Sequence, residues 1–230
     1  FFEAINISLN NYPIEHILNR EPKLLEIFES ESNHDFSLVI DGEERFFKID
    51  VVPLGEPHDG NTRMLKSIRD VTEERKIQDK LKFLATIDSL SGLYNRAEFM
   101  NLAKKEFAWA KTNNEELSLL IMDLDNFKNI NDSFGHAAGD EMIREIGSII
   151  LTSFRKTDIA GRIGGEEFAV ILRNASLEEA KIVAEKFRET VASRKVIYEG
   201  QEISSTVSIG VAAIRGKTDD ISNVEDILKM

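Results

Sequence analysis

The sequence predicts an α/β (α+β) protein in two parts: a sheet flanked by helices, preceded by a smaller α+β domain and a helical linker. Residues 117–122 form an apolar run of strand length, and the apolar runs 158–163 and 168–172 flank two glycines. Residues 177–194 repeat apolar side chains at helical spacing. The length of 230 residues suits two modest domains, each with its own core.

Residues 1–71 are expected to form the smaller domain. The predicted elements are a helical region over 14–29 broken near Pro22, strands over 36–40 and 45–52 joined by a turn at Asp41-Gly42, and a third strand over 63–71. This last strand ends in Asp70-Val71-Thr72-Glu73, which resembles the D-[IV]-T-E end of PAS sensor domains. The resemblance implies a partial PAS-like sensor domain.

Residues 72–87 are expected to link the two domains as a signalling helix. The segment is rich in Glu, Lys and Arg, and Ile77, Leu81, Leu84 and Asp88 follow a 4-3-4 spacing, as in a short coiled-coil seam. A pattern of only two heptads is equally compatible with a single amphipathic helix that packs on its own domain. A parallel dimer through this helix would let the sensor set how two copies of the following domain meet.

The apolar run 117–122 is interrupted only by Ser118 and predicts a strand buried on both faces. It ends in Asp123-Leu124-Asp125, and acids at the carboxyl end of a strand lie where α/β sheets place ligands. Residues 126–130 then predict the start of a short helix, with Asp125 as its N-cap. Backbone N–H groups at a helix N-terminus bind anionic oxygens.

Asn131 and Asp140 lie in the polar segment that follows. An amide and a carboxylate can together bind a guanine edge, because the carboxylate accepts from N1–H and from the exocyclic amine. The alternative is a polar loop with a helix cap at Asp140.

Gly164-Gly165 predicts a tight hairpin turn of the primed type, which needs φ > 0. The turn presents Glu166 and Glu167 at its exit. If this hairpin pairs beside the strand 117–122, Asp123 and Glu166 converge on one hard cation. Mg²⁺ prefers oxygen ligands and often bridges carboxylates to substrate phosphates. Taken alone, two glycines followed by two acids also fit an ordinary solvated turn.

These motifs occur in one order over residues 88–214. They are Asp88-Ser89-Leu90-Ser91-Gly92-Leu93-Tyr94-Asn95-Arg96, Asp123-Leu124-Asp125-Asn126-Phe127-Lys128, Asn131-Asp132, Gly135-His136, Gly139-Asp140 and Arg162-Ile163-Gly164-Gly165-Glu166-Glu167-Phe168. Together they resemble the GGDEF domain of diguanylate cyclases, in its GGEEF variant, with Ser91 in place of the usual Thr. The resemblance implies a fold related to nucleotidyl-cyclase and polymerase palm domains, with a mixed sheet flanked by helices, over residues 88–230.

The resemblance also implies the site residues. Each domain would bind one GTP with Mg²⁺, or with Mn²⁺ in its place, through the carboxylates of Asp123 and Glu166 and the backbone carbonyl of Leu124. The residues implied in nucleotide binding are Asn126, Phe127 and Lys128 at the β- and γ-phosphates, Gly164 and Gly165 at the α-phosphate, Asn131 and Asp140 at guanine, and His136 close to the nucleotide.

The implied reaction is attack by the 3′-hydroxyl of one GTP on the α-phosphorus of another, which releases pyrophosphate and, once repeated, closes cyclic di-GMP. Glu166 and Glu167 are the catalytic candidates, and the choice of base between them stays open. Because each half-site carries one substrate, the enzyme is expected to act as a homodimer. A catalytically silent receptor for cyclic di-GMP is the alternative function.

Arg155-Lys156-Thr157-Asp158 matches the R-x-x-D motif of product inhibition in this family, and five residues separate Asp158 from Gly164. Arginine binds phosphate and stacks on purines, so Arg155 and Asp158 would hold cyclic di-GMP, with Arg194 contributed by a facing domain. The alternative is a basic helix end followed by the first residue of a strand.

Residues 196–198 and 203–214 predict strands joined near Gly200, and Val224, Ile227 and Leu228 predict a final amphipathic helix. The family pattern continues into a helix like L-Y-x-A-K-x-x-G-R-N, which this sequence does not contain. The sequence is therefore expected to be a fragment.

The net charge of −12 disfavours a nucleic-acid surface, and the absence of cysteine excludes disulfides and thiolate metal sites. No stretch of about 18 apolar residues occurs, so no membrane contact is expected within the chain. The expected location is the cytoplasm, either free or as the cytoplasmic part of a larger, membrane-attached bacterial sensor.

Overall fold

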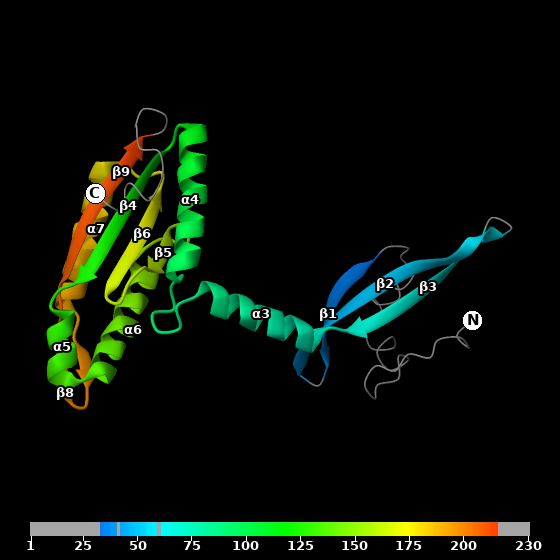
Figure 1. The fold of residues 1–230 in the computed structure, drawn as a ribbon, viewed down its shortest axis with the longest axis horizontal. Coiled ribbons are helices and arrows are strands. Elements are labelled where there is room, and N and C mark those ends of the chain that lie inside the picture. The colour runs from blue at the N-terminus through cyan, green and yellow to red at the C-terminus, as the bar shows by residue number, and fades with distance from the viewer. Residues whose placement is uncertain (1–32, 41, 59–60, 216–230) are drawn as a thin grey trace. The chain divides into compact units, whose positions relative to one another are not determined.

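The computed structural model describes residues 33–40, 42–58 and 61–215 of the chain (Figure 1). The chain forms two compact units, residues 1–81 and 82–230. The helices predicted over 14–29 and around Val224 lie outside the described residues.

The first unit contains an antiparallel sheet of three strands in the order β1 (His34–Ile40), β2 (Glu43–His58) and β3 (Asn61–Asp70). Ile40 pairs with Glu43, so two residues join the first two strands, and Gly42 has φ = 82° as such a turn requires. Phe47 and Ile49 of β2 are buried, and the Phe47 ring stacks on Phe36 at 5.4 Å between centroids. The predicted hairpin at Asp41-Gly42 therefore agrees with the pairing of its flanking strands.

Helix α3 spans Thr72–Thr86, as the charge-rich linker predicts. Its start is fixed by Thr72, whose hydroxyl accepts a hydrogen bond of 2.8 Å from the N–H of Phe46. The helix ends before Asp88, because Ile87 forms an antiparallel bridge with Tyr94. The prediction that Asp88 continues the seam is therefore wrong, whereas the three apolar members lie on the helix and are 57–60% exposed: Ile77, Leu81 and Leu84.

The second unit is built on a sheet with the strand order β5-β6-β4-β9. The strands are β4 (Glu116–Leu124), β5 (Ile159–Arg162), β6 (Glu167–Arg173) and β9 (Val207–Arg215). Every pairing between these strands is antiparallel, and the parallel component in the described residues is a single bridge between Tyr94 and Gly161. The predicted central strand is confirmed. Its one polar interruption, Ser118, is fully buried and donates a hydrogen bond of 2.8 Å to the carbonyl of Ala175.

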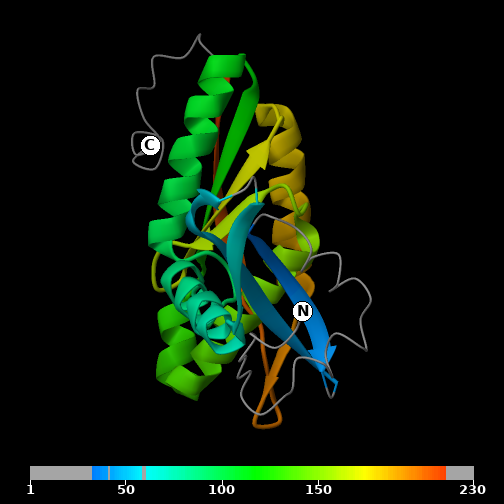
Figure 2. The same cartoon turned by 90° about the vertical axis from the view of Figure 1, so that its right-hand side faces the viewer.

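Helices cover both faces of this sheet, as predicted. Helix α4 (Arg96–Asn113) packs on one face, and α6 (His136–Ser153) and α7 (Leu177–Ser193) pack on the other (Figures 1 and 2). Side chains of β4 and β6 alternate between the two cores. The core under α4 contains Phe99, Phe107, Leu119, Ala169 and Ile171, and the core under α6 and α7 contains Leu120, Met122, Ile143, Phe168 and Phe187.

Two elements lie beyond the carboxyl end of β4. One is helix α5 (Phe127–Phe134), and the other is a hairpin of β7 (Val196–Tyr198) and β8 (Gln201–Ile203) (Figure 1). The predicted single strand 203–214 is wrong, because residues 204–206 separate β8 from β9. Among the described residues, no helix has the length and apolar character needed to cross a membrane.

Candidate active site

The hairpin with the two glycines lies beside the end of β4, as predicted. Strand β6 runs antiparallel to β4 with Glu167 directly opposite Asp123. One residue further on, the N–H of Leu124 donates to the carbonyl of Glu166 at 3.3 Å. The backbone pairing therefore brings Asp123, at the end of a buried strand, next to both glutamates of the turn.

The turn itself differs from the prediction. Four residues, 163–166, connect β5 to β6, and the N–H groups of Ile163 and Gly164 both donate to the carbonyl of Glu167, at 2.8 and 3.2 Å. Neither Gly164 nor Gly165 is among the described residues with positive φ, so the predicted primed turn is wrong. A four-residue connection reverses the chain without left-handed backbone.

The two glycines have different surroundings. A Cβ on Gly164 would lie 2.1 Å from Oε2 of Glu167, so the carboxylate of Glu167 folds back against the turn. A Cβ on Gly165 would meet no atom within 4 Å. A Cβ at residue 164 would thus displace the end of an exposed glutamate side chain, whereas residue 165 faces open space.

Asp125 does not cap α5 as predicted. The N-cap is Asn126, with φ = 58° and, in the described structure, no side-chain hydrogen bond to the helix. The carboxylate of Asp125 instead accepts hydrogen bonds from the hydroxyls of Ser208 at 2.6 Å and Thr206 at 2.5 Å, and these bonds hold its pKa below the usual range. Among the described residues, the N–H groups of Phe127 and Lys128 at the start of α5 have no acceptor, so they are available to an anion.

Asn131 and Asp140 both belong to the region where α5 meets α6. Gly139 is buried at this contact, and a Cβ there would lie 2.1 Å from Oδ1 of Asn131. The amide of Asn131 thus rests on Gly139, one residue from the exposed Asp140. Asp140 lies inside α6, whose N-cap is Gly135, so the alternative of a helix cap at Asp140 is wrong.

The donors near the turn suit a hard cation. Asp123 and Glu166 offer carboxylate oxygens, and Leu124 offers a backbone carbonyl. No three His, Cys, Asp or Glu side chains cluster as a metal site in the part of the chain that the structure describes. Two carboxylates with open positions fit Mg²⁺, which usually keeps waters or takes substrate phosphate oxygens as its other ligands.

Arg155 and Asp158 share one turn between α6 and β5. The carboxylate of Asp158 accepts a hydrogen bond of 3.0 Å from the N–H of Arg155, whose side chain is exposed. Arg194 follows the end of α7 and forms an ion pair of 3.2 Å with Glu145 of α6, about two turns before the end of that helix. At 1.5 Å per residue, those turns separate Glu145 from the end of α6, after which Arg155 follows, by roughly 12 Å.

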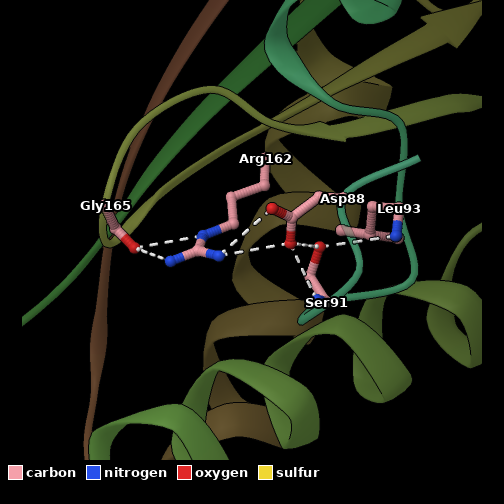
Figure 3. Close-up of polar contacts among 5 residues, drawn as sticks. All are labelled: Asp88, Ser91, Leu93, Arg162 and Gly165. Carbon is pink, nitrogen blue, oxygen red and sulfur yellow. Dashed lines mark hydrogen bonds and ion pairs between the residues drawn. The ribbon is translucent and has the colours of Figure 1, made fainter. Parts of the chain in front are cut away.

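Sequence reasoning assigned no role to the side chain of Arg162. Figure 3 shows its guanidinium between the carbonyl of Gly165 and the carboxylate of Asp88. The sequence analysis also did not single out Thr206 and Ser208, although a run of hydroxyl residues around the start of β9 was an available signal.

Comparison with known proteins agrees with this geometry. A family model described as "Diguanylate cyclase, GGDEF domain" matches residues 85–229. Diguanylate cyclase A of Treponema denticola is 40% identical over 133 residues, which are 56% of this chain and 36% of that protein. The matched parts cover only 15% to 45% of the length of three curated relatives.

Solved structures share the fold of the second unit. The coiled coil and GGDEF domain of DgcB from Caulobacter crescentus, in complex with c-di-GMP, is 28% identical with a TM-score of 0.63, over 69% of this chain and 83% of that one. The active GGEEF domain of a diguanylate cyclase from Vibrio cholerae is 31% identical with a TM-score of 0.54, over 59% of this chain and 83% of that one.

Proposed function

Because the chain belongs to the GGDEF family of diguanylate cyclases, we propose that it condenses two molecules of GTP into cyclic di-GMP with release of pyrophosphate. The observation that carries this proposal is the pairing of β4 with β6. It sets the acids of the Gly164–Glu167 turn against Asp123, beside an uncapped helix start. Acids and free N–H groups together suit a triphosphate with its cation.

Guanine binding is proposed at the contact of α5 with α6. Asp140 would accept from N1–H and N2–H, and the amide of Asn131, held on Gly139, would bond a second position of the base edge. The exposed His136 begins α6 close by. The triphosphate would run from this contact to the start of α5, where Asn126, Phe127 and Lys128 present backbone N–H groups.

Mg²⁺, or Mn²⁺ in its place, would be held by Asp123, Glu166 and the Leu124 carbonyl. When bound, the ion would neutralise phosphoryl charge and acidify the attacking hydroxyl. The space beside Gly165 would accept the α-phosphate, because no protein atom lies where its Cβ would point.

The reaction forms a bond between the 3′-oxygen of one GTP and the α-phosphorus of the other, and breaks the bond from that phosphorus to the pyrophosphate oxygen. The proton of the 3′-hydroxyl must leave. Glu166 is the first candidate to accept it and Glu167, whose carboxylate lies over Gly164, is the second.

Two copies of the site are needed, so we propose that the chain acts as a homodimer. The apolar stripe of Ile77, Leu81 and Leu84 on α3 supports a parallel helical contact between copies. The proposed domain boundaries are 1–71 for a PAS-like sensor, 72–87 for the signalling helix and 88–230 for the GGEEF domain. A cytoplasmic location is part of the same proposal.

Product inhibition is proposed at Arg155 and Asp158, with Arg194 supplied by a facing domain. The ion pair of Arg194 with Glu145, two turns of α6 away from the end that precedes Arg155, supports this division between copies. A silent receptor for cyclic di-GMP is less favoured, because both turn acids and both glycines are present.

Chromatography with mass detection of the nucleotides formed from GTP and Mg²⁺ tests the proposal. The unsubstituted chain should form cyclic di-GMP, and Glu166→Gln should lower the rate at least a hundredfold. Glu178→Gln, which removes an exposed acid paired with Lys181 on α7, is the matched control and should retain the rate. A folded chain that binds cyclic di-GMP and forms none of it would instead support the receptor.

A further inference from the structure

We propose that Arg162 is a positioning residue that fixes the turn carrying Gly165 and Glu166, and that Asp88 and Ser91 hold Arg162 in place for this purpose. The inference rests on the proposed function of the turn as the site of the cation and the α-phosphate. It adds a residue network that touches neither the nucleotide nor the cation in that proposal.

The guanidinium of Arg162 bonds two partners at once (Figure 3). Its Nε and Nη2 donate to the carbonyl of Gly165 at 3.1 and 2.7 Å, and its Nη1 donates to both carboxylate oxygens of Asp88 at 3.2 and 3.3 Å. The side chains of Arg162 and Asp88 are 17% and 25% exposed, so solvent screens this pair less than a surface pair. The planar guanidinium has donors in fixed directions, so it fixes the positions of both partners as well as attracting them. A lysine ammonium would not reproduce this geometry.

Asp88 is itself oriented by Ser91. The carboxylate accepts hydrogen bonds of 2.8 Å from both the N–H and the hydroxyl of Ser91. Burial raises the pKa of Asp88, but the bonds from Ser91 and then Arg162 outweigh burial and hold the pKa below its usual range. Asp88 therefore stays ionised at neutral pH and keeps its pair with Arg162.

The backbone of Ser91 packs closely against α6. It is buried, and its carbonyl lies so close to Gly147 that a Cβ there would approach the oxygen to 2.1 Å. The network thus runs from a packed helix through Ser91, Asp88 and Arg162 to the turn.

Other hydrogen bonds hold the start of the turn, at Arg162 and Ile163, but they do not reach its tip at Gly165. The N–H of Arg162 donates to the Tyr94 carbonyl at 2.9 Å, and the Arg96 side chain donates to the Ile163 carbonyl at 3.4 Å. At the tip, Gly165 is exposed and its carbonyl accepts from Arg162. Removing the guanidinium would leave the tip next to Glu166 free to move while the strands stay paired.

Hydrogen–deuterium exchange of the intact chain, without nucleotide, tests this step directly. The reporters are the N–H groups of Ile163, Gly164 and Leu124, which bond across the turn. Arg162→Lys and Asp88→Asn should each speed their exchange at least tenfold and leave exchange in α4 and α7 within twofold. Because two different variants are used, the test can still be made if one of them fails to fold.

Glu106→Gln is the matched control. It breaks the ion pair between Arg173, at the far end of β6, and Glu106 of α4, and should leave exchange at the turn unchanged. Unchanged exchange at the turn in both test variants, or an equal rise throughout residues 82–215, would overturn the proposal. This readout needs no product, so its failure is distinct from failure of the proposed function.

Kinetics adds a second readout in the chain that forms cyclic di-GMP. Arg162→Lys and Asp88→Asn should lower kcat at least tenfold. KM for GTP should stay within threefold, because the proposed contacts to guanine come from α5 and α6 and not from the turn. Loosened exchange with an unchanged kcat would also overturn the positioning role.

Discussion

At the residue scale, the proposal assigns the choice of purine to Asp140. Asp140 is exposed and follows Gly139, against which the Asn131 amide packs. A carboxylate has acceptors only, and guanine presents two adjacent donors, N1–H and N2–H. Adenine has no donor at N1, so in this proposal the same side chain would select against ATP.

Asp140→Asn should therefore weaken the use of GTP. The amide has one acceptor oxygen, so it would either turn its own donor toward N1–H or lose one of the two hydrogen bonds to guanine. Either change weakens binding of GTP by about 1.5–3 kcal/mol, which raises KM roughly ten- to hundredfold. The variant should also lose its preference for GTP over inosine triphosphate, which lacks the N2 amine. Steady-state rates with both nucleotides measure this, and Glu141→Gln, whose carboxylate pairs with Arg144, is the control. An unchanged preference would remove Asp140 from guanine recognition.

Individual residues were predictable where backbone pairing decides their place. Asp123 and Glu166 follow from a strand end and a hairpin, so the sequence pattern sufficed. Asp125 looked like a helix cap, but its carboxylate is bound by Thr206 and Ser208, about 80 positions later in the chain. The sequence around Asp125 does not show that the hydroxyl run before β9 would bind it, and these tertiary hydrogen bonds override the local preference for a helix cap.

At the element scale, close packing of α6 on the Ser91 loop depends on Gly147, whereas the role proposed for Gly165 is in binding the α-phosphate. A Cβ on Gly147 would strike a backbone oxygen, which has little room to move. A Cβ on Gly165 would meet no protein atom, so its absence is explained by the proposed α-phosphate. The two glycines thus separate stability from function.

Gly147→Ala should lower the free energy of unfolding by about 1–3 kcal/mol through overpacking. Gly165→Ala should leave it within about 0.5 kcal/mol and still reduce cyclic di-GMP formation at least tenfold. The fluorescence of Trp109, the single tryptophan, follows urea unfolding of the second unit. Full activity of Gly165→Ala would contradict the placement of the α-phosphate.

Elements were predicted best where local signals agreed. Helix α7 begins as expected, because Ser176 and Glu179 form a reciprocal capping box and the apolar face has helical period. The hairpin was placed correctly but with the wrong turn, because glycines suggested left-handed backbone and a four-residue connection does not need it. The break at 204–206 was missed, since β-prone residues continue on both sides of it.

At the scale of the whole molecule, the proposed reaction requires two chains. Each domain would supply one GTP site, and the exposed apolar stripe on α3 offers a contact for a second copy. Composition predicted two domains and a helical linker, but a heptad pattern this short does not specify a dimer. Asp88, which the same pattern placed in the seam, belongs to the Arg162 network instead.

The most direct measurement is the initial rate of pyrophosphate release from GTP as the chain concentration is varied, with cyclic di-GMP counted in the same samples. Two half-sites predict two pyrophosphates per cyclic di-GMP. They also predict a rate that rises with the square of the concentration wherever sedimentation shows mostly monomer. A rate proportional to concentration in that range, or inorganic phosphate in place of pyrophosphate, would contradict the account.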